Sequence, residues 1–177
     1  MRHAAVTFVL ACIACTPLPC AAQESARPEA FGGYAFARDH DRNMHGWDGA
    51  VTFSVSKWLG VSADISGQYV ALGPTDRARF ALLGGARVSP WRGRFTPFGY
   101  ALAGAFHTRS HLEFLSVSVN EGETDPGAAL GGGVGVRVSG RWVAEVKADA
   151  ALIRSKGRTE SNPRLFAGLA LRFGRQP

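Results

Sequence analysis

Cysteine, clustered basic residues and long apolar segments are scarce in this sequence, and each absence excludes something. All three cysteines of the 177 residues lie within positions 1–22. If that segment is removed on export, the mature chain has no disulfide and no thiolate for catalysis. Lys and Arg outnumber Asp and Glu by 20 to 14 but form no block, which argues against nucleic-acid binding. No apolar run is long enough for a transmembrane helix, so only a barrel of alternately apolar strands could cross a membrane.

The first 22 residues have the composition of a secretory signal peptide. Arg2 and His3 form a basic start, residues 4–14 are apolar, and residues 16–22 are small, with a cleavage point between Ala22 and Gln23. A lipoprotein signal at Cys20 is disfavoured because the preceding residues do not form a lipobox. The sequence therefore predicts export and a single domain over residues 23–177.

The most informative stretch joins a Gly-rich run over residues 127–138 to a charged run over residues 142–153. In both runs apolar side chains occupy every second position, which is the period of a strand. Residues 142–153 alone also fit an amphipathic helix, but the Gly-rich run does not. Folded as a hairpin about a three-residue loop at 139–141, the runs place a glycine opposite each charge. The predicted pairs are Gly135 with Glu145, Gly133 with Lys147, and Gly131 with Asp149.

The same alternation recurs along the chain and predicts eight strands. Beyond the first strand, whose facing is ambiguous, one face of each is apolar at alternate positions over Trp47–Val55, Leu59–Tyr69, Phe80–Val88, Phe98–Phe106, Ala128–Val138, Trp142–Leu152 and Leu165–Phe173. Short turns are predicted near Lys57, Pro90 and Gly140. Longer loops are predicted at residues 40–44, 71–75, 107–124 and 155–162, although residues 112–119 could extend the flanking strands.

The predicted apolar faces carry no charge, whereas the opposite faces carry charges of both signs. A charge at the bilayer midplane costs roughly 2–4 kcal/mol, so the uncharged faces are expected to meet lipid and the charged faces to line a lumen. Eight strands leave a lumen that side chains just fill, so the charges are expected to form a structural network. That predicted network consists of Asp64, Arg87, Arg137, Glu145, Lys147, Asp149 and Arg172.

Aromatic residues gather at both predicted ends of the strands. Near the short turns we expect an aromatic girdle formed by Trp58, Trp91, Trp142 and Phe173. Toward the long loops a second girdle could be formed by Trp47, Tyr69, Phe80 and Phe106.

Four stretches resemble the small eight-stranded outer-membrane β-barrels of the OmpA-like class. They are FGGYAFAR (31–38), residues 46–69, TPFGYALAGA (96–105) and LFAGLALRFG (165–174). The resemblance implies an all-β, antiparallel, up-and-down transmembrane barrel in the bacterial outer membrane, with periplasmic termini and with lipid and lipopolysaccharide as surroundings. The closing strand resembles the signal that such barrels present to the outer-membrane insertion machinery, except that Phe173 is followed by residues 174–177.

Few residues suggest chemistry. His107, His111 and Glu113 could hold a metal ion, but the spacing suits a helix and no HExxH motif is present. His40, Asp41 and His45 are interpreted as solvated loop residues. The glycines of 131–135 are not followed by a helix, which argues against a phosphate-binding loop.

We therefore expect no catalytic, cofactor-binding or metal-binding residues, and a structural role or surface contact through the loops. Two alternatives remain open. A lipid hydrolase of the lipid A deacylase type would use His107 with Ser110, and a narrow ion-conducting pore would use the lumen charges.

Overall fold

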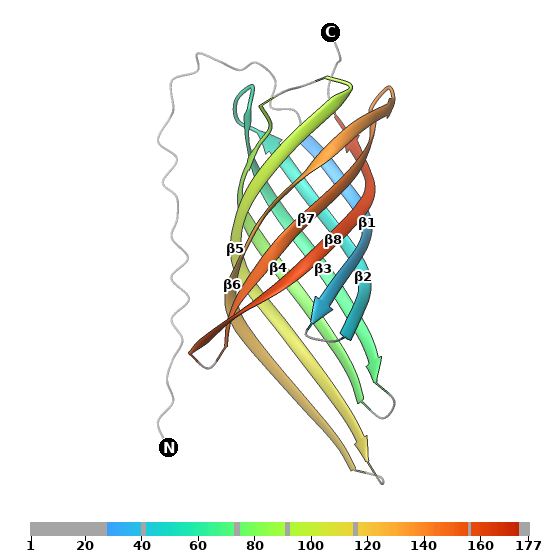
Figure 1. Cartoon of the computed structure of the whole chain (residues 1–177), viewed down its shortest axis with the longest axis vertical. Coiled ribbons are helices and arrows are strands. Elements are labelled where there is room, and N and C mark those ends of the chain that lie inside the picture. Colours follow the sequence, from blue (N-terminus) through green and yellow to red (C-terminus); the bar gives the residue numbers. More distant parts are fainter. Residues whose placement is uncertain are drawn as a thin grey trace.

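The computed structural model describes residues 28–39, 42–72, 75–90, 93–114, 117–155 and 157–173, so the predicted signal peptide lies outside the described residues. These ranges form eight strands arranged as a tilted barrel (Figure 1). The strands are β1 (Pro28–Asp39), β2 (Arg42–Ser54), β3 (Leu59–Leu72), β4 (Thr75–Val88), β5 (Phe95–Phe114), β6 (Val117–Ser139), β7 (Trp142–Ser155) and β8 (Arg158–Arg172). Within the described ranges there is no helix that could span a membrane.

The sheet closes on itself. Each strand pairs antiparallel with the next, and β8 pairs with β1 from Glu29–Arg172 to Ala37–Arg164. The backbone N–H of Phe173 also donates to the carbonyl oxygen of Pro28 at 2.9 Å. Because the barrel is closed, each strand is hydrogen-bonded to a neighbouring strand on both sides, as a strand in hydrocarbon must be. The predicted eight-stranded up-and-down barrel is confirmed.

The barrel has two distinct ends. The terminal end holds the start of β1, the end of β8 and the connections from β2 to β3, from β4 to β5 and from β6 to β7. The hairpin end holds the other four connections, of which the β5–β6 hairpin projects furthest (Figure 1).

The predicted long loops are wrong, because most of their residues lie in strands. Residues 107–114 belong to β5 and residues 117–126 to β6, and β8 begins at Arg158 rather than after Pro163. Loss of apolar alternation marked the end of the apolar band and not the end of backbone pairing, since antiparallel hydrogen bonds do not require apolar side chains. Only the expectation that residues 112–119 extend the flanking strands agrees with the observed hairpin.

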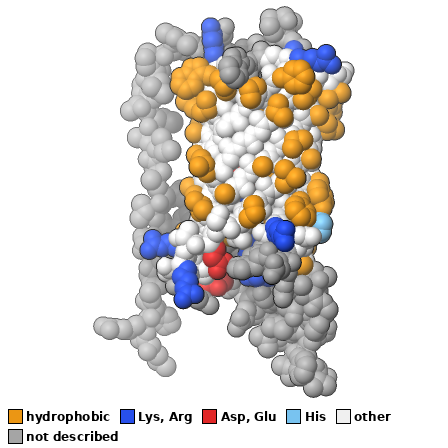
Figure 2. Space-filling view, in the orientation of Figure 1, with side chains coloured by type: hydrophobic (Ala, Val, Ile, Leu, Met, Phe, Trp, Pro, Cys, Tyr) orange, Lys and Arg blue, Asp and Glu red, His pale blue; other side chains and the backbone are white. Residues whose placement is uncertain are grey.

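Apolar side chains cover the outer wall of the barrel. Figure 2 shows them over the barrel body, with Lys and Arg gathered toward the two ends. Exposed large apolar residues include Val61, Ile65, Leu82, Leu130, Val134, Val146, Leu165 and Leu169. In water such a surface would be unusually apolar for a monomer, whereas a barrel in lipid requires it.

Strand β5 faces the opposite way from the prediction. Its large residues were expected to meet lipid, but Phe98, Tyr100, Leu102 and Phe106 are buried in the lumen. The outer face of β5 instead presents Ala101, Ala103 and Ala105, which are exposed. Neither face of this segment carries a charge, so alternation alone could not assign its direction.

The predicted β6–β7 register is confirmed over its central pairs, with Gly131, Gly133 and Gly135 opposite Asp149, Lys147 and Glu145. The connection differs slightly from the predicted three-residue loop. Ser139 pairs with Trp142, so the turn consists of Gly140 and Arg141, and the register shifts between Arg137 and Ser139. Gly140 has a φ of 43°, a left-handed conformation that favours glycine.

Candidate functional site

The lumen is filled by ion pairs arranged along the barrel axis. At the terminal end, the Arg87 guanidinium bridges two carboxylates, lying 3.1 Å from Glu29 and 2.9 Å from Glu145. Arg172 makes a second ion pair with Glu29, with Nε 2.5 Å from the carboxylate oxygen. This group ties β1, β4, β7 and β8 together across the lumen.

The middle of the lumen is organised around Lys147. Its Nζ lies 2.7 Å from Asp48 and 2.9 Å from Asp64, which come from β2 and β3. Lys147 is only 5% exposed. A buried cation of this kind is tolerated because carboxylates compensate its charge.

Toward the hairpin end, Asp149 accepts three hydrogen bonds. Arg164 donates two of them, from Nε and Nη2, each at 2.8 Å. The hydroxyl of Tyr100 donates the third at 2.9 Å. The two-pronged contact is the strong geometry for Arg and carboxylate, and it fixes β7 to β8 while Tyr100 joins β5.

Aromatic rings fill the space between the ion pairs. The Arg87 guanidinium lies 3.8 Å from the centre of the Phe98 ring, and Lys147 Nζ lies 4.8 Å from those of Phe31 and Phe166. Cations over ring faces gain further stabilisation where water is excluded. Because Phe98 comes from β5, this contact also gives a reason why β5 turns its rings inward.

Glycines of β6 provide the room for both sets of side chains. A Cβ at Gly133 would lie 2.8 Å from Cζ of Phe98, and a Cβ at Gly135 would lie 3.3 Å from the Glu145 carboxylate. Phe98 and Tyr100 are the direct β5 partners of Gly133 and Gly131. The glycines were predicted to leave space for the charged side chains of β7. They leave space for the aromatic rings of β5 as well.

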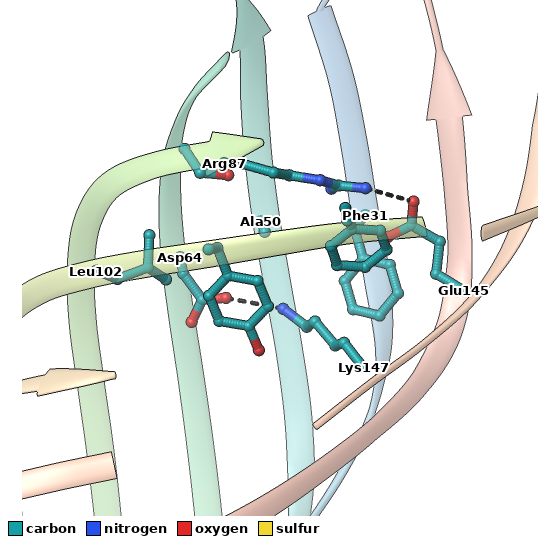
Figure 3. Close-up of a pocket in the computed structure, with 10 residues that line it drawn as sticks. Phe31, Ala50, Asp64, Arg87, Leu102, Glu145 and Lys147 are labelled. Carbon is teal, nitrogen blue, oxygen red and sulfur yellow. Dashed lines mark hydrogen bonds and ion pairs between the residues drawn. The ribbon is translucent and has the colours of Figure 1, made fainter. Parts of the chain in front are cut away.

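A small cavity of about 20 Å³ lies in the lumen beside Arg87, Glu145 and Lys147 (Figure 3). It is lined by Phe31, Ala50, Ser62, Asp64, Arg87, Phe98, Tyr100, Leu102, Glu145 and Lys147. A single water needs roughly 10–15 Å³, so this cavity holds about one water.

The structure buries most of the predicted lumen charges, and it adds others. Asp64, Arg87, Glu145, Lys147 and Asp149 are buried and paired, and Arg172 is partly exposed. Arg137 is exposed, although it lies on the lumen-facing side of β6, paired with buried Val143. It lies beside the register shift next to the turn, where the neighbouring walls no longer enclose a side chain.

Among the ion pairs described above, three charged partners were absent from the predicted network. They are Glu29, Asp48 and Arg164. Asp48 and Arg164 stood on charged faces in the sequence pattern, which was a usable signal. Glu29 lay in a segment interpreted as a polar lead-in, and the ambiguous facing of the first strand gave no sign that its side chain enters the lumen.

The outer wall carries aromatic residues at each end. At the terminal end Trp58, Trp142 and Phe173 are exposed, whereas Trp91 lies outside the described residues. Toward the hairpin end Trp47 Nε1 donates to the Tyr69 hydroxyl at 3.4 Å, and the Tyr69 ring packs edge-on against Phe80. Tyr34 and His45 also form a hydrogen bond there.

Phe106 does not belong to this second aromatic group. It is 1% exposed and lies inside the lumen, so the prediction that it faces lipid is wrong. The reason is the reversed facing of β5.

His107, the residue of greatest chemical interest in the sequence, lies on the outer face of β5. Arg109 Nε–H donates to its Nε2 at 3.2 Å, and its Nδ1 lies 2.8 Å from Thr124 Oγ1. Because Arg109 can only donate, Nε2 accepts and the neutral ring carries its proton on Nδ1. His107 therefore donates to Thr124, which is the wrong direction for a base that activates a hydroxyl.

The other residues of the chemical hypotheses are not described in full. The side chains of Ser110, His111 and Glu113, and residues His40 and Asp41, lie outside the described part. Among the side chains that the structure describes, no group of three or more His, Cys, Asp or Glu is placed to hold a metal ion.

No known family model matches the sequence, and no curated protein matches it. Solved structures do. Ail, the attachment invasion locus protein of Yersinia pestis, is similar with a TM-score of 0.65 and 16% identity, over 84% of this chain and 99% of Ail. Neisserial surface protein A gives 0.60 and 15%, over 83% and 96%. The outer membrane protein OprG of Pseudomonas aeruginosa gives 0.59 and 12%, over 85% and 97%.

At such identities the likeness concerns the fold alone. It agrees with the closed eight-stranded topology and with the apolar outer wall. The chain has the fold of the small eight-stranded outer-membrane β-barrel proteins.

Proposed function

We propose that this chain is a bacterial outer-membrane protein with a sealed lumen, which acts through its outer surface and its hairpin end. Its role is envelope integrity or surface contact, without catalysis. The observation that carries the proposal is the lumen itself, where ion pairs and rings leave a cavity of about 20 Å³. A protein that transports solutes needs a path through the wall or the lumen, and the ion pairs of Arg87 and Lys147 lie across this lumen.

The projecting β5–β6 hairpin supports a role in contact. The β6–β7 ladder begins at Gly127–Ile153, so residues 117–126 of β6 are paired only with β5 within the described ranges. A strand edge of this kind offers backbone donors and acceptors beyond the barrel wall. Ail, with the same fold, has been crystallised in complex with the heparin analogue sucrose octasulfate.

The proposal includes the steps that would bring the chain to its place. Residues 1–22 act as a cleaved signal peptide, and the closing strand with Phe173 is recognised by the outer-membrane insertion machinery. Once inserted, the barrel contacts phospholipid and lipopolysaccharide. The supporting features are the composition of residues 1–22 and the apolar closing strand.

The two alternative functions fit the geometry less well. A pore would have to break the Arg87–Glu145 and Lys147–Asp64 pairs to open. A hydrolase would need a hydroxyl that donates to His107, whereas the ring donates to Thr124.

Location and orientation can be tested with single cysteines, since all natural cysteines lie in the predicted signal peptide. Glu123 is exposed on β6 toward the hairpin end, and Arg141 is exposed in a turn at the terminal end. The two single-cysteine variants are therefore Glu123→Cys and Arg141→Cys. In intact cells a membrane-impermeant maleimide is expected to label the first variant and not the second. Equal labelling of both, or recovery of the chain in the soluble periplasmic fraction, would contradict the proposal.

The sealed lumen is tested by conductance in planar bilayers. The natural chain is expected to be silent. Frequent stable openings of the natural chain would favour the pore instead.

A further inference from the structure

Two arginines lie opposite each other at the mouth of the lumen, at the terminal end of the barrel. The backbone N–H of Arg137 on β6 donates to the carbonyl oxygen of Arg94 at 2.8 Å, which continues the β5–β6 ladder one step beyond its Phe95–Val136 pair. Directly opposite residues of a ladder point to the same side of the sheet, with Cβ atoms about 5 Å apart. The side chains of Arg94 and Arg137 therefore leave the wall side by side.

Both arginines are on the lumen-facing side of their strands. Arg94 is two residues from Thr96, which is buried, and Arg137 pairs with Val143, which is also buried. The outer wall at this level is formed by Phe95, which is 63% exposed. Arg94 and Arg137 are nevertheless exposed, because the lumen opens at this end. The two guanidinium groups thus belong to the open mouth of the barrel and not to the wall that meets lipid.

Neither arginine has an ion-pair partner within the described part of the chain, unlike the cations deeper in the lumen. Toward this end the described acidic residues are Glu29 and Glu145. Both are bound by Arg87, and Glu29 also binds Arg172. Like charges directly opposite one another destabilise a ladder. The arginine pair therefore carries an unfavourable repulsion that an anion between the two guanidinium groups would remove.

Other exposed cations surround this pair. Lys57 lies in the β2–β3 connection and Arg141 in the β6–β7 turn, and both are exposed. On the face shown in Figure 2, the charged side chains drawn in colour at the terminal end, which is uppermost, are Lys or Arg. Charge of one sign around a site raises the local concentration of oppositely charged ligands.

The openness of the pair indicates the kind of anion that fits it. Each guanidinium offers a planar fork that matches a carboxylate with two hydrogen bonds. Arg94 and Arg137 lie at exposed positions and not in an enclosed pocket that would surround a small molecule. An open site suits a flexible chain with repeated carboxylates, because several weak contacts along it add up. In the proposed orientation this end faces the periplasm, where the peptide stems of the cell-wall polymer carry such carboxylates.

We propose that Arg94 and Arg137 form a binding site for carboxylates of the cell-wall polymer at the periplasmic mouth of the barrel. A carboxylate that enters between the two guanidinium groups removes their repulsion and accepts hydrogen bonds from their forks. Lys57 and Arg141 raise the positive potential around the site. This inference rests on the proposed function, whose role in envelope integrity it makes specific, and on the terminal end facing the periplasm.

The test is co-sedimentation of the folded, detergent-solubilised full chain with the purified, insoluble cell-wall polymer. The probes are the untreated polymer and the same polymer after its carboxylates have been converted to amides. The natural chain is expected to sediment with the first and not with the second, and to be released by about 0.5 M NaCl, because exposed charges are screened. Arg94→Gln with Arg137→Gln should weaken binding about tenfold. The double Lys variant keeps both charges without the forks and should lose about threefold.

Three further variants separate the site from general charge and from an occupant within the chain. Arg38→Gln with Arg154→Gln removes two exposed arginines at the hairpin end and should bind as the natural chain does. Arg141→Gln removes a cation at the terminal end outside the pair and should cost less than about twofold. Glu24 lies outside the described residues, and Glu24→Gln should leave binding unchanged.

Four outcomes would overturn the site. They are equal binding of the amidated polymer, an equal loss in the hairpin-end double variant, stronger binding of Glu24→Gln, which would show that the chain itself occupies the pair, and full displacement by micromolar polyglutamate, which would assign the pair to acidic protein segments. All variants are first checked for heat-modifiable gel migration, which the removal of unpaired charges should leave unchanged. Labelling of Arg141→Cys in intact cells reports orientation separately. If that cysteine is labelled, the proposed function falls; if it is protected and the polymer result is negative, the carboxylate site alone falls.

Discussion

Phe98 of β5 lies directly across from Gly133 of β6, and the ring occupies the space that a side chain at position 133 would need. Gly133→Ala would place its Cβ 2.2 Å from the backbone carbonyl oxygen of Val146 and 2.8 Å from Cζ of Phe98. We expect a loss of about 1–3 kcal/mol in the free energy of unfolding, as for other overpacked interiors. Urea titration of the barrel in phosphatidylcholine vesicles measures it.

Gly99→Ala is the matched control for this substitution. Gly99 faces outward on β5, and the nearest atom to its Cβ would be 3.7 Å away, an ordinary contact. Its effect should stay within about 0.5 kcal/mol. If the two variants unfold alike, the lumen is not packed as tightly as the structure indicates.

Lys147→Met removes the cation that Asp48 and Asp64 share. Because both carboxylates stay buried and uncompensated, we expect the barrel to lose about 3–5 kcal/mol of stability. The same urea titration reports the loss. In the triple variant with Asp48→Asn and Asp64→Asn no charge is left unpaired, and most of the stability should return. A single variant as stable as the natural chain would show that Lys147 is solvated instead.

Val146→Arg tests whether the outer wall faces hydrocarbon. Val146 is exposed and pairs with Val134 and Ala167 in the middle of its ladders. An arginine near the bilayer midplane should cost roughly 2–4 kcal/mol, whereas Val138→Arg, beside the turn at the terminal end, should cost at most about 1 kcal/mol. Stability in vesicles is compared for the two variants. Equal costs would mean that the wall does not cross a bilayer.

Phe173→Ala tests the proposed recognition of the closing strand. Phe173 is exposed at the end of the chain's last ladder. We expect assembly by proteoliposomes that contain the insertion machinery to slow several-fold, while spontaneous folding into pure lipid vesicles changes little. Trp142→Ala, an exposed aromatic residue at the same end but on β7, should leave assembly unaffected. If both variants slow assembly equally, the effect is that of any interfacial aromatic residue.

The predicted register of β6 and β7 illustrates how far local pattern reaches. Each β7 charge needed an empty partner, and Gly131, Gly133 and Gly135 supplied it at the correct spacing. Where neither face of a strand carries a charge, the alternation does not show which face is turned to the lumen. Over residues 98–106 both faces of β5 are uncharged, and the larger side chains were assigned to lipid although they fill the lumen.

The outer wall was also read correctly where charge marked one face of a strand. The strand ends were predicted wrongly from polarity. The hairpins continue beyond the apolar band, and their polar residues remain paired in the ladders. Arg137 shows a related limit of the pattern, since alternation gives a residue's side of the sheet but not how far the barrel encloses its side chain.

By itself the sequence determined the class of fold, the number of strands and the outward direction of most of them, because alternation with period two is a local property of a strand. It could not determine which charges meet. Lys147 and Asp64 are 83 residues apart, and they contact one another only because eight tilted strands close a ring narrow enough for opposite walls to touch. The same closure decided that β5 turns its rings inward, since volume left by glycines on one strand can be filled only by its neighbours.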